Sequence, residues 1–174
     1  MKNGDVMVYN HQIEDELRGY INHLHDGDIV IVLSAYSEMG EDIAYCVNKD
    51  REFGFVKQVS LIPTRIERSK LAWGPKFIIG DTVWVTRHDH PWGRYGEDEY
   101  FVGQGMIYET QQEVVDVYLE EGTGEYMYDL NRDYFCPVLQ RYLTDEEETD
   151  EEIIPGDMDE ILVRNGGGNH EAQE

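Results

Sequence analysis

The sequence predicts a mainly β protein with two small β-barrels, and three observations support this prediction. Gly80-Asp81-Thr82-Val83-Trp84-Val85 has the pattern of a turn opening into a strand, and Gly27-Asp28-Ile29-Val30-Ile31-Val32 repeats it about 50 residues earlier. Fainter copies stand at Gly4-Asp5 and Gly156-Asp157. Short apolar segments recur at intervals of roughly ten residues, separated by turn-forming residues. The 12 tyrosines and 17 glycines also favour strands and turns over helical bundles.

Composition restricts the class of protein. A chain of 174 residues with 40% apolar side chains is too apolar for a disordered protein and long enough for two small cores. Cys46 and Cys136 are far apart and lack CxxC spacing, so we expect small core residues rather than a disulfide or zinc site. No apolar run approaches the roughly 18 residues of a membrane span, and the N-terminus lacks a signal-peptide pattern. We therefore expect a cytoplasmic protein.

The net charge of −23 is the most unusual property of the chain. Residues 1–75 carry 12 acidic and 8 basic side chains, residues 76–144 carry 13 and 5, and residues 145–174 carry 12 and 1. Acidity therefore rises along the chain. Such a field excludes nucleic acid and anionic membrane as direct partners and favours a basic protein. The sequence carries no signal for the oligomeric state.

The N-terminal residues 1–26 are expected to form a short strand and a helix that pack on the first barrel. After Val6–Tyr9, one face of the segment His11–Leu24 is apolar at helical spacing, which predicts an amphipathic helix. Gly19 weakens it, so the helix needs docking. His23 and His25 would stand at its C-terminal end, where imidazolium complements the helix dipole; metal binding is the alternative role for these two histidines.

The first barrel is predicted over residues 27–75. Its expected strands are Ile29–Leu33, Ile43–Val47, Phe53–Val56 and Leu61–Pro63. Ala44-Tyr45-Cys46-Val47, the polar Asn-Lys-Asp-Arg hairpin, Gly54-Phe55-Val56 and Leu61-Ile62-Pro63 together resemble the second half of an SH3-like barrel. The resemblance covers about 45 residues. It implies the fold but not the proline-rich ligands of peptide-binding SH3 domains, because the paired tryptophan and acidic loop of those domains are missing.

The second SH3-like barrel is predicted over residues 76–144. It begins at Phe77-Ile78-Ile79, and its later elements are a long loop at 87–96, a strand over Tyr100–Tyr108, a hairpin of Val114–Leu119 with Glu125–Leu130, and a closing segment Phe135–Leu139. Residues 145–174 form an acidic tail that is expected to be mostly flexible, because blocks of like charge repel. Within it, two segments are apolar enough to dock as an edge strand, namely Ile153-Ile154-Pro155 and Ile161-Leu162-Val163.

The richest group of candidate site residues lies in the long loop of the second barrel and in its acidic neighbours. An aromatic and cationic loop followed by carboxylates is typical of a protein-contact surface. The predicted partner-binding residues are His88, His90, Trp92, Arg94, Tyr95, Glu97, Asp98, Glu99, Glu120, Glu121, Glu125 and Asp129. An ordinary structured loop is one alternative. Another is a metal site, because His88 and His90 would point to the same side of an extended segment with Asp98 or Glu99 as third ligand.

No catalytic motif accompanies these residues. Carboxylates are so frequent that pairs of them carry no weight for acid–base chemistry, and no nucleophile-elbow or Walker pattern is present. We therefore expect a non-enzymatic protein without a cofactor.

Three functions remain open. In size and charge the chain is similar to acidic nucleic-acid mimics, such as phage-encoded inhibitors of restriction, CRISPR or polymerase machinery and immunity proteins for nuclease toxins. This likeness implies a decoy that blocks the basic nucleic-acid-binding surface of a partner, by the physics that draws phosphate into that surface. The first alternative is a tandem SH3-like adaptor whose aromatic loops bind a partner. The second is a metal-binding protein that uses the His88/His90 loop.

Overall fold

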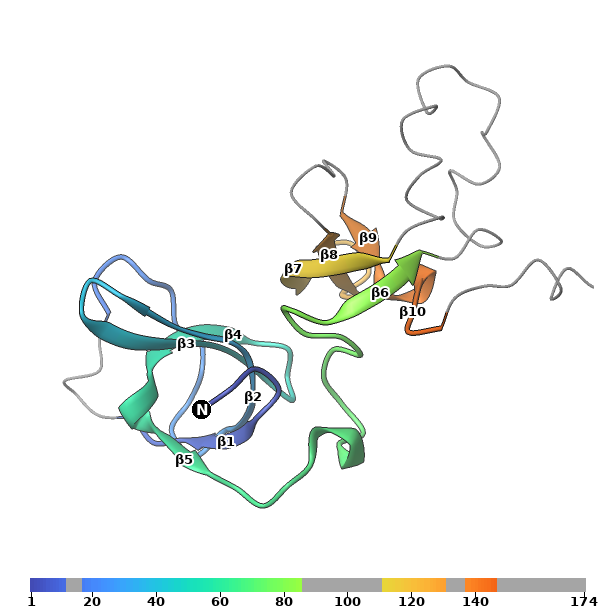
Figure 1. The fold of residues 1–174 in the computed structure, drawn as a ribbon. Coiled ribbons are helices and arrows are strands. Elements are labelled where there is room, and N and C mark those ends of the chain that lie inside the picture. Colours follow the sequence, from blue (N-terminus) through green and yellow to red (C-terminus); the bar gives the residue numbers. More distant parts are fainter. Residues whose placement is uncertain (12–16, 86–110, 131–136, 147–174) are drawn as a thin grey trace, which may run out of the picture.

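The computed structural model describes residues 1–11, 17–85, 111–130 and 137–146 (Figure 1). In these residues the chain is mainly β and forms two five-stranded antiparallel sheets, which confirms the predicted fold class at this level. The expected strand Tyr100–Tyr108 and the acidic tail beyond Glu146 lie outside them. No helix in the described ranges is both long and apolar enough to cross a bilayer.

The first sheet contains the N-terminal strand as an interior member. Its strand order is β4-β3-β2-β1-β5, so β1 lies between β2 and β5. A 3-10 turn, Gln58–Ser60, precedes the last strand. The five strands are β1 (Val6–Tyr9), β2 (Ile29–Glu38), β3 (Glu41–Asn48), β4 (Phe53–Lys57) and β5 (Leu61–Pro63).

The second sheet repeats this arrangement. Its order is β10-β6-β7-β8-β9, in which the first strand again lies between the second and the fifth. A 3-10 turn, Gln140–Tyr142, again precedes the fifth strand. The strands are β6 (Thr82–Val85), β7 (Gln112–Leu119), β8 (Tyr126–Leu130), β9 (Val138–Leu139) and β10 (Leu143–Thr144). Strands β7 and β8 confirm the predicted hairpin.

Strand β2 is buried on both faces because it contributes to two hydrophobic clusters. Val30 and Val32 pack inside the first sheet with a cluster that also contains the buried Cys46, as expected for that residue. Ile31 and Leu33 point to the opposite face and join a cluster that continues into the second sheet. This second cluster also contains Phe77, Ile78, Val83, Val85, Val114, Val117, Tyr126, Tyr128, Leu130, Val138 and Leu143. The two sheets therefore share an apolar core.

The repeated Gly-Asp pairs form one kind of turn. Gly4, Gly27 and Gly80 have φ of 88°, 87° and 93°, a left-handed conformation that glycine adopts without steric cost. In each turn the carboxylate of the following aspartate accepts a hydrogen bond from the backbone N–H three residues before it, at 2.8–3.0 Å. The donors are Lys2, His25 and Ile78. The sequence repeat thus marks a structural turn; Gly156-Asp157 lies outside the described residues.

The predicted N-terminal helix is wrong over the described part of its range. Residues 18–19 form a turn in which Gly19 has a φ of 85°, and residues 20–24 run beside β4. The Phe55 N–H donates to the Ile21 carbonyl at 3.1 Å, and the His23 N–H donates to the Phe53 carbonyl at 3.0 Å. Backbone pairing with a sheet edge has replaced helical hydrogen bonding, so neither His23 nor His25 caps a helix. Residues 12–16 lie outside the described residues.

A linker connects the sheets and packs into their shared core. Leu71 and Trp73 contact the cluster, and a Cβ at Gly74 would collide with Ile31. Direct contacts reinforce the packing: the Tyr45 hydroxyl donates to the Val117 carbonyl at 3.2 Å, and the Arg51 guanidinium donates to the Gly124 carbonyl. The second sheet is therefore fixed against the β3–β4 side of the first.

Candidate functional site

The predicted partner-binding residues fall into two groups. His88, His90, Trp92, Arg94, Tyr95, Glu97, Asp98 and Glu99 lie outside the described residues, and with them the His88/His90 metal site. Glu120, Glu121, Glu125 and Asp129 belong to the β7–β8 hairpin. The structure therefore places four of the twelve predicted residues on one hairpin.

The Glu120 carboxylate is directed back to its own turn. It accepts the Thr123 N–H at 2.7 Å and also the Thr123 hydroxyl. These hydrogen bonds lower the pKa of Glu120, the hydroxyl contributing most. Glu120 thus stabilises the hairpin turn in its ionised form, while Glu121 beside it is exposed.

Glu125 is bound to the end of the second sheet. Its Oε2 lies 2.9 Å from Nη2 of Arg141, and its Oε1 accepts the Arg141 N–H at 3.2 Å. Because both oxygens are engaged by the 3-10 turn before β10, Glu125 acts as a structural clamp, and its charge is already balanced.

Asp129 forms the acidic centre of the hairpin together with Asp116, which sequence reasoning missed. The two residues are direct cross-strand partners, so two carboxylates of like charge stand opposite each other. The Tyr118 hydroxyl donates to Asp129 Oδ1 at 2.9 Å. Shielding from water raises the pKa of Asp116, and the negative charge of Asp129 raises it further. The pair is therefore held together against electrostatic repulsion.

A β-bulge explains why the sequence did not reveal this pair. The register of β7 against β8 shifts between Val114 and Asp116, so Val114 and Val117 are both buried although they are an odd number of residues apart. Regular alternation would instead place Asp116 on the same face as Val114. The extra residue, Val115, is 39% exposed. Only the odd spacing of the two buried valines signals the bulge in the sequence.

Two features of the hairpin determine what it can do chemically. The first is that the outward face presents carboxylates beside a phenol, from Asp116, Asp129 and Tyr118. The second is that burial, together with the hydrogen bond to Asp129, raises the pKa of Tyr118 well above its usual value. Tyr118 therefore remains a donor at neutral pH. The surface attracts lysine and arginine side chains, and it offers no nucleophile.

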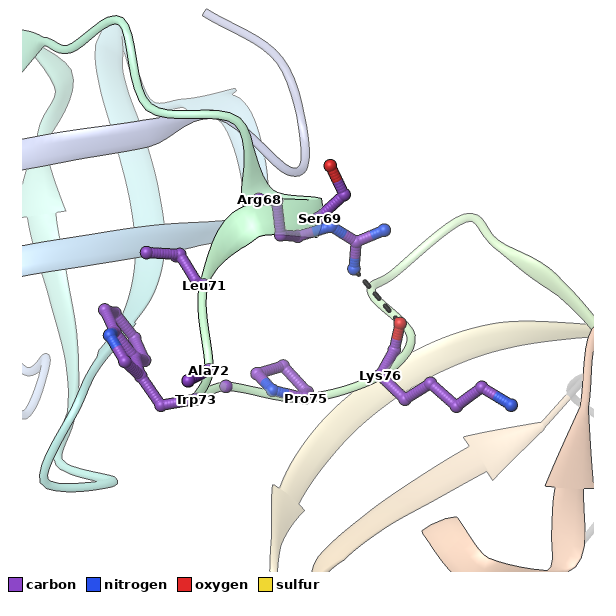
Figure 2. A pocket seen from close by; sticks show the side chains of 8 residues that line it. Arg68, Ser69, Leu71, Ala72, Trp73, Pro75 and Lys76 are labelled. Atoms are coloured by element: carbon purple, nitrogen blue, oxygen red, sulfur yellow. Dashed lines mark hydrogen bonds between the residues drawn. The ribbon is translucent and has the colours of Figure 1, made fainter.

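A cavity of about 430 Å³ lies within the linker, between residues Arg68 and Lys76 (Figure 2). The Arg68 guanidinium donates to the Lys76 carbonyl at 3.3 Å, which closes the loop, and it lies 3.7 Å from the Asp81 carboxylate. In Figure 2 the Lys76 side chain points away from the loop. Leu71, Ala72, Trp73 and Pro75 supply apolar lining. Because the Arg68 guanidinium is already engaged by Lys76 and Asp81, the cavity presents no unpaired guanidinium to a ligand.

An apolar row remains exposed on the first sheet. Val8 is the cross-strand partner of both Ile29 and Ile62, so the three β-branched side chains cross strands β2, β1 and β5. Ile29 is 41% and Ile62 is 49% exposed. The row lies on the same face as Val6 and Ile31, which belong to the shared core. The row of Val8, Ile29 and Ile62 therefore continues the apolar face of the shared core to the solvent-exposed surface of the first sheet.

Comparison with known proteins identifies no relative: no family model, curated protein or solved structure matches the chain.

Proposed function

We propose that this protein is a non-enzymatic acidic binding protein that blocks the basic nucleic-acid-binding surface of a partner protein. One observation carries the proposal: Asp116 and Asp129 stand directly opposite each other on the outward face of β7–β8, on a chain with a net charge of −23. In this proposal the protein acts as a phage-type anti-defence or immunity-like inhibitor. The partner that suits its charge is a nucleic-acid-handling enzyme.

The physical reason is charge complementarity. Opposed carboxylates repel in the free protein, and a lysine or arginine placed between them turns this repulsion into attraction. A groove that binds phosphates already presents such cations and accepts carboxylates in the same way. Affinity should then fall with salt, because exposed charges are screened.

The proposal includes an SH3-like fold for both sheets. Support comes from the strand order, in which the first strand lies between the second and the fifth in each sheet, and from the 3-10 turn before each fifth strand. The proposed boundaries are residues 76–144 for the second barrel and 145–174 for the tail. The first barrel, predicted over residues 27–75 with residues 1–26 packed on it, also includes β1, because β1 lies between β2 and β5 in its sheet.

A tandem SH3-like adaptor is the second candidate, and the exposed row of Val8, Ile29 and Ile62 favours it. Apolar contact would then supply the affinity, and acidity would serve solubility. In this alternative the Trp92→Ala variant loses its partner, whereas loss of the tail has no effect.

The test is capture of partners from lysate on the full chain, followed by elution with excess duplex DNA or RNA at constant salt. A decoy shares its binding surface with nucleic acid, so we expect nucleic-acid enzymes to be displaced by it and also to elute below about 0.5 M salt. Partners that stay bound under both treatments contradict the proposal.

A matched pair of variants separates the hairpin from bulk charge. Asp116→Asn/Asp129→Asn and Asp42→Asn/Asp50→Asn each remove two negative charges, the first from the hairpin and the second from exposed positions of the first sheet. The hairpin variant should weaken capture at least tenfold, while the second should leave it nearly unchanged. Equal effects would contradict a role for the hairpin, and loss of capture only with Trp92→Ala would favour the adaptor.

A further inference from the structure

We propose that His25, Asp28 and Glu52 form a binding site for a divalent transition-metal ion such as Zn²⁺. Each residue offers one ligand atom, and the three atoms lie within 4.8 Å of one another. Nδ1 of His25 is 3.3 Å from Oε2 of Glu52 and 3.8 Å from Oδ2 of Asp28. None of the three residues belongs to the predicted His88/His90 site or to the acidic β7–β8 hairpin.

These separations suit a single ion. With zinc bonds of roughly 2.1 Å at tetrahedral angles, neighbouring ligand atoms stand about 3.4 Å apart. The two distances from His25 lie close to this value. The Asp28 and Glu52 oxygens lie within 4.8 Å of each other, and the partly exposed Glu52 side chain is the one that would adjust on binding. Water would complete the coordination. The combination of one imidazole and two carboxylates favours zinc and its neighbours over Ca²⁺ or Mg²⁺, which prefer oxygen ligands alone.

Both elements of the site are fixed before any ion arrives. Asn48 is 1% exposed, and its Nδ2 donates to Asp28 Oδ2 and to Glu52 Oε2, each at 2.8 Å. Its Oδ1 accepts the backbone N–H groups of Asp50 and Glu52. One buried amide therefore holds the β3–β4 hairpin beside the turn of residues 25–28, which reduces the cost of ordering the ligands.

The Gly-Asp turn that contains Asp28 differs from the turn that contains Asp81 in how its carboxylate is balanced. The Asp28 carboxylate accepts its own turn's N–H, as Asp5 and Asp81 do in theirs. Asp81 is balanced by Arg68 at 3.7 Å. Asp28 instead faces a second carboxylate, Glu52, and among the described residues no lysine or arginine pairs with either. In the part of the chain that the structure describes, His25 is the one basic side chain within 4 Å of these carboxylates, and a bound divalent ion would neutralise both of them.

The experiment is a calorimetric titration of the full chain with Zn²⁺. The His88→Ala/His90→Ala variant serves as the parent, so that the loop histidines contribute nothing, and about 5 mM Mg²⁺ occupies weak sites on the acidic surface. We expect one Zn²⁺ per chain, and at least tenfold weaker binding when His25→Ala is added. His23→Ala, which removes a nearby exposed histidine, should leave the affinity unchanged.

A second measurement follows the His25 ring directly. Its imidazole NMR resonances should shift until one equivalent of Zn²⁺ has been added, while the other histidine resonances stay in place. His25 is exposed, so its substitution should leave the melting temperature without metal unchanged and confine the effect to binding. Equal Zn²⁺ affinity with and without His25→Ala, or a His25 resonance that does not respond, overturns the proposal.

Discussion

Two tyrosines on strand β8 are buried to a similar degree but differ in what their hydroxyl groups contact. The Tyr128 hydroxyl accepts the Phe77 N–H at 3.3 Å and donates to Oε1 of Gln140 at 2.6 Å. Gln140 also accepts the Lys76 N–H at 2.8 Å, so Tyr128 joins the linker to the end of the second sheet. The Tyr126 hydroxyl is buried without a hydrogen-bond partner among the described residues.

The Tyr128→Phe variant should lower the free energy of unfolding by about 1–3 kcal/mol, because it leaves the buried Phe77 N–H without its acceptor and removes one of the two donors to Gln140 Oε1. Tyr126→Phe removes a hydroxyl that has no hydrogen-bond partner in the described part of the chain, so it should be neutral or stabilise by up to about 1 kcal/mol. Urea denaturation of the two variants measures both effects. A larger loss for Tyr126→Phe than for Tyr128→Phe would contradict this assignment of hydrogen bonds.

At the scale of the element, the β7–β8 hairpin combines a stabilised turn with a repulsive face. Glu120 and Glu125 secure its turn and its edge, whereas Asp116 and Asp129 repel each other on its outward side. A raised folded-state pKa means that the folded protein binds the Asp116 proton more tightly than the unfolded chain does. Asp116 therefore destabilises the fold once it is ionised, and the penalty disappears as pH falls.

The Asp116→Asn variant should raise the free energy of unfolding at pH 7 by about 0.2–1 kcal/mol, the usual range for cross-strand pairs. The amide keeps an oxygen to accept the Val117 N–H, which Asp116 Oδ1 accepts at 2.8 Å. The gain should shrink as pH falls through the folded-state pKa and vanish below the ordinary value of 3.8, where both states bind the proton.

Denaturation curves across pH provide the measurement, with Asp50→Asn as the control for net charge. Asp50 is an exposed acid on the β3–β4 hairpin of the first sheet. A stabilisation by Asp116→Asn that persisted unchanged at pH 3 would rule out titration of this carboxyl as its cause.

At the scale of the whole molecule, the shared core makes the two sheets one folding unit. Ile31 belongs to the first sheet, is fully buried, and packs in the cluster that contains Val83 and Tyr128 of the second. Arg51 supports the same junction, because its guanidinium also lies 5.7 Å from the centre of the Tyr126 ring. Loss of packing in one sheet is therefore transmitted to the other.

The Ile31→Ala variant should destabilise both sheets together, by about 2–5 kcal/mol. None of the three tryptophans belongs to a strand of the first sheet: Trp73 lies in the linker, Trp84 lies on β6, and Trp92 lies outside the described residues. Tryptophan fluorescence and amide exchange of β3 therefore report on different parts of the molecule. Both should shift to the same lower urea midpoint. Ile62→Ala, at an exposed position, is the matched control and should shift neither. Loss of protection in β3 with unchanged fluorescence would show that the sheets unfold separately.

Local features of the sequence predicted much of the fold. The β3–β4 and β7–β8 hairpins follow from apolar segments around polar turns, and the Gly-Asp pairs correctly mark turns. The candidate site was predicted less well. Asp116 was missed because a bulge reversed its face. The predicted position of His25 at a helix end was wrong because residues 20–24 pair with a sheet edge instead of forming a helix, whereas its alternative role in metal binding stays a prediction.

The sequence by itself determined the β class, the turns and the acidity, because these depend on side chains close together in the chain. Tertiary structure decided which charges meet. Asp116 opposes Asp129 through strand register, and His25 reaches Glu52 only because the turn of residues 25–28 packs beside the β3–β4 hairpin. Tertiary structure also decided that the apolar run Ile29–Leu33 contributes to two cores. The sequence could not show this, because a strand buried on both faces lacks the alternation of apolar and polar residues that would reveal a second packing partner.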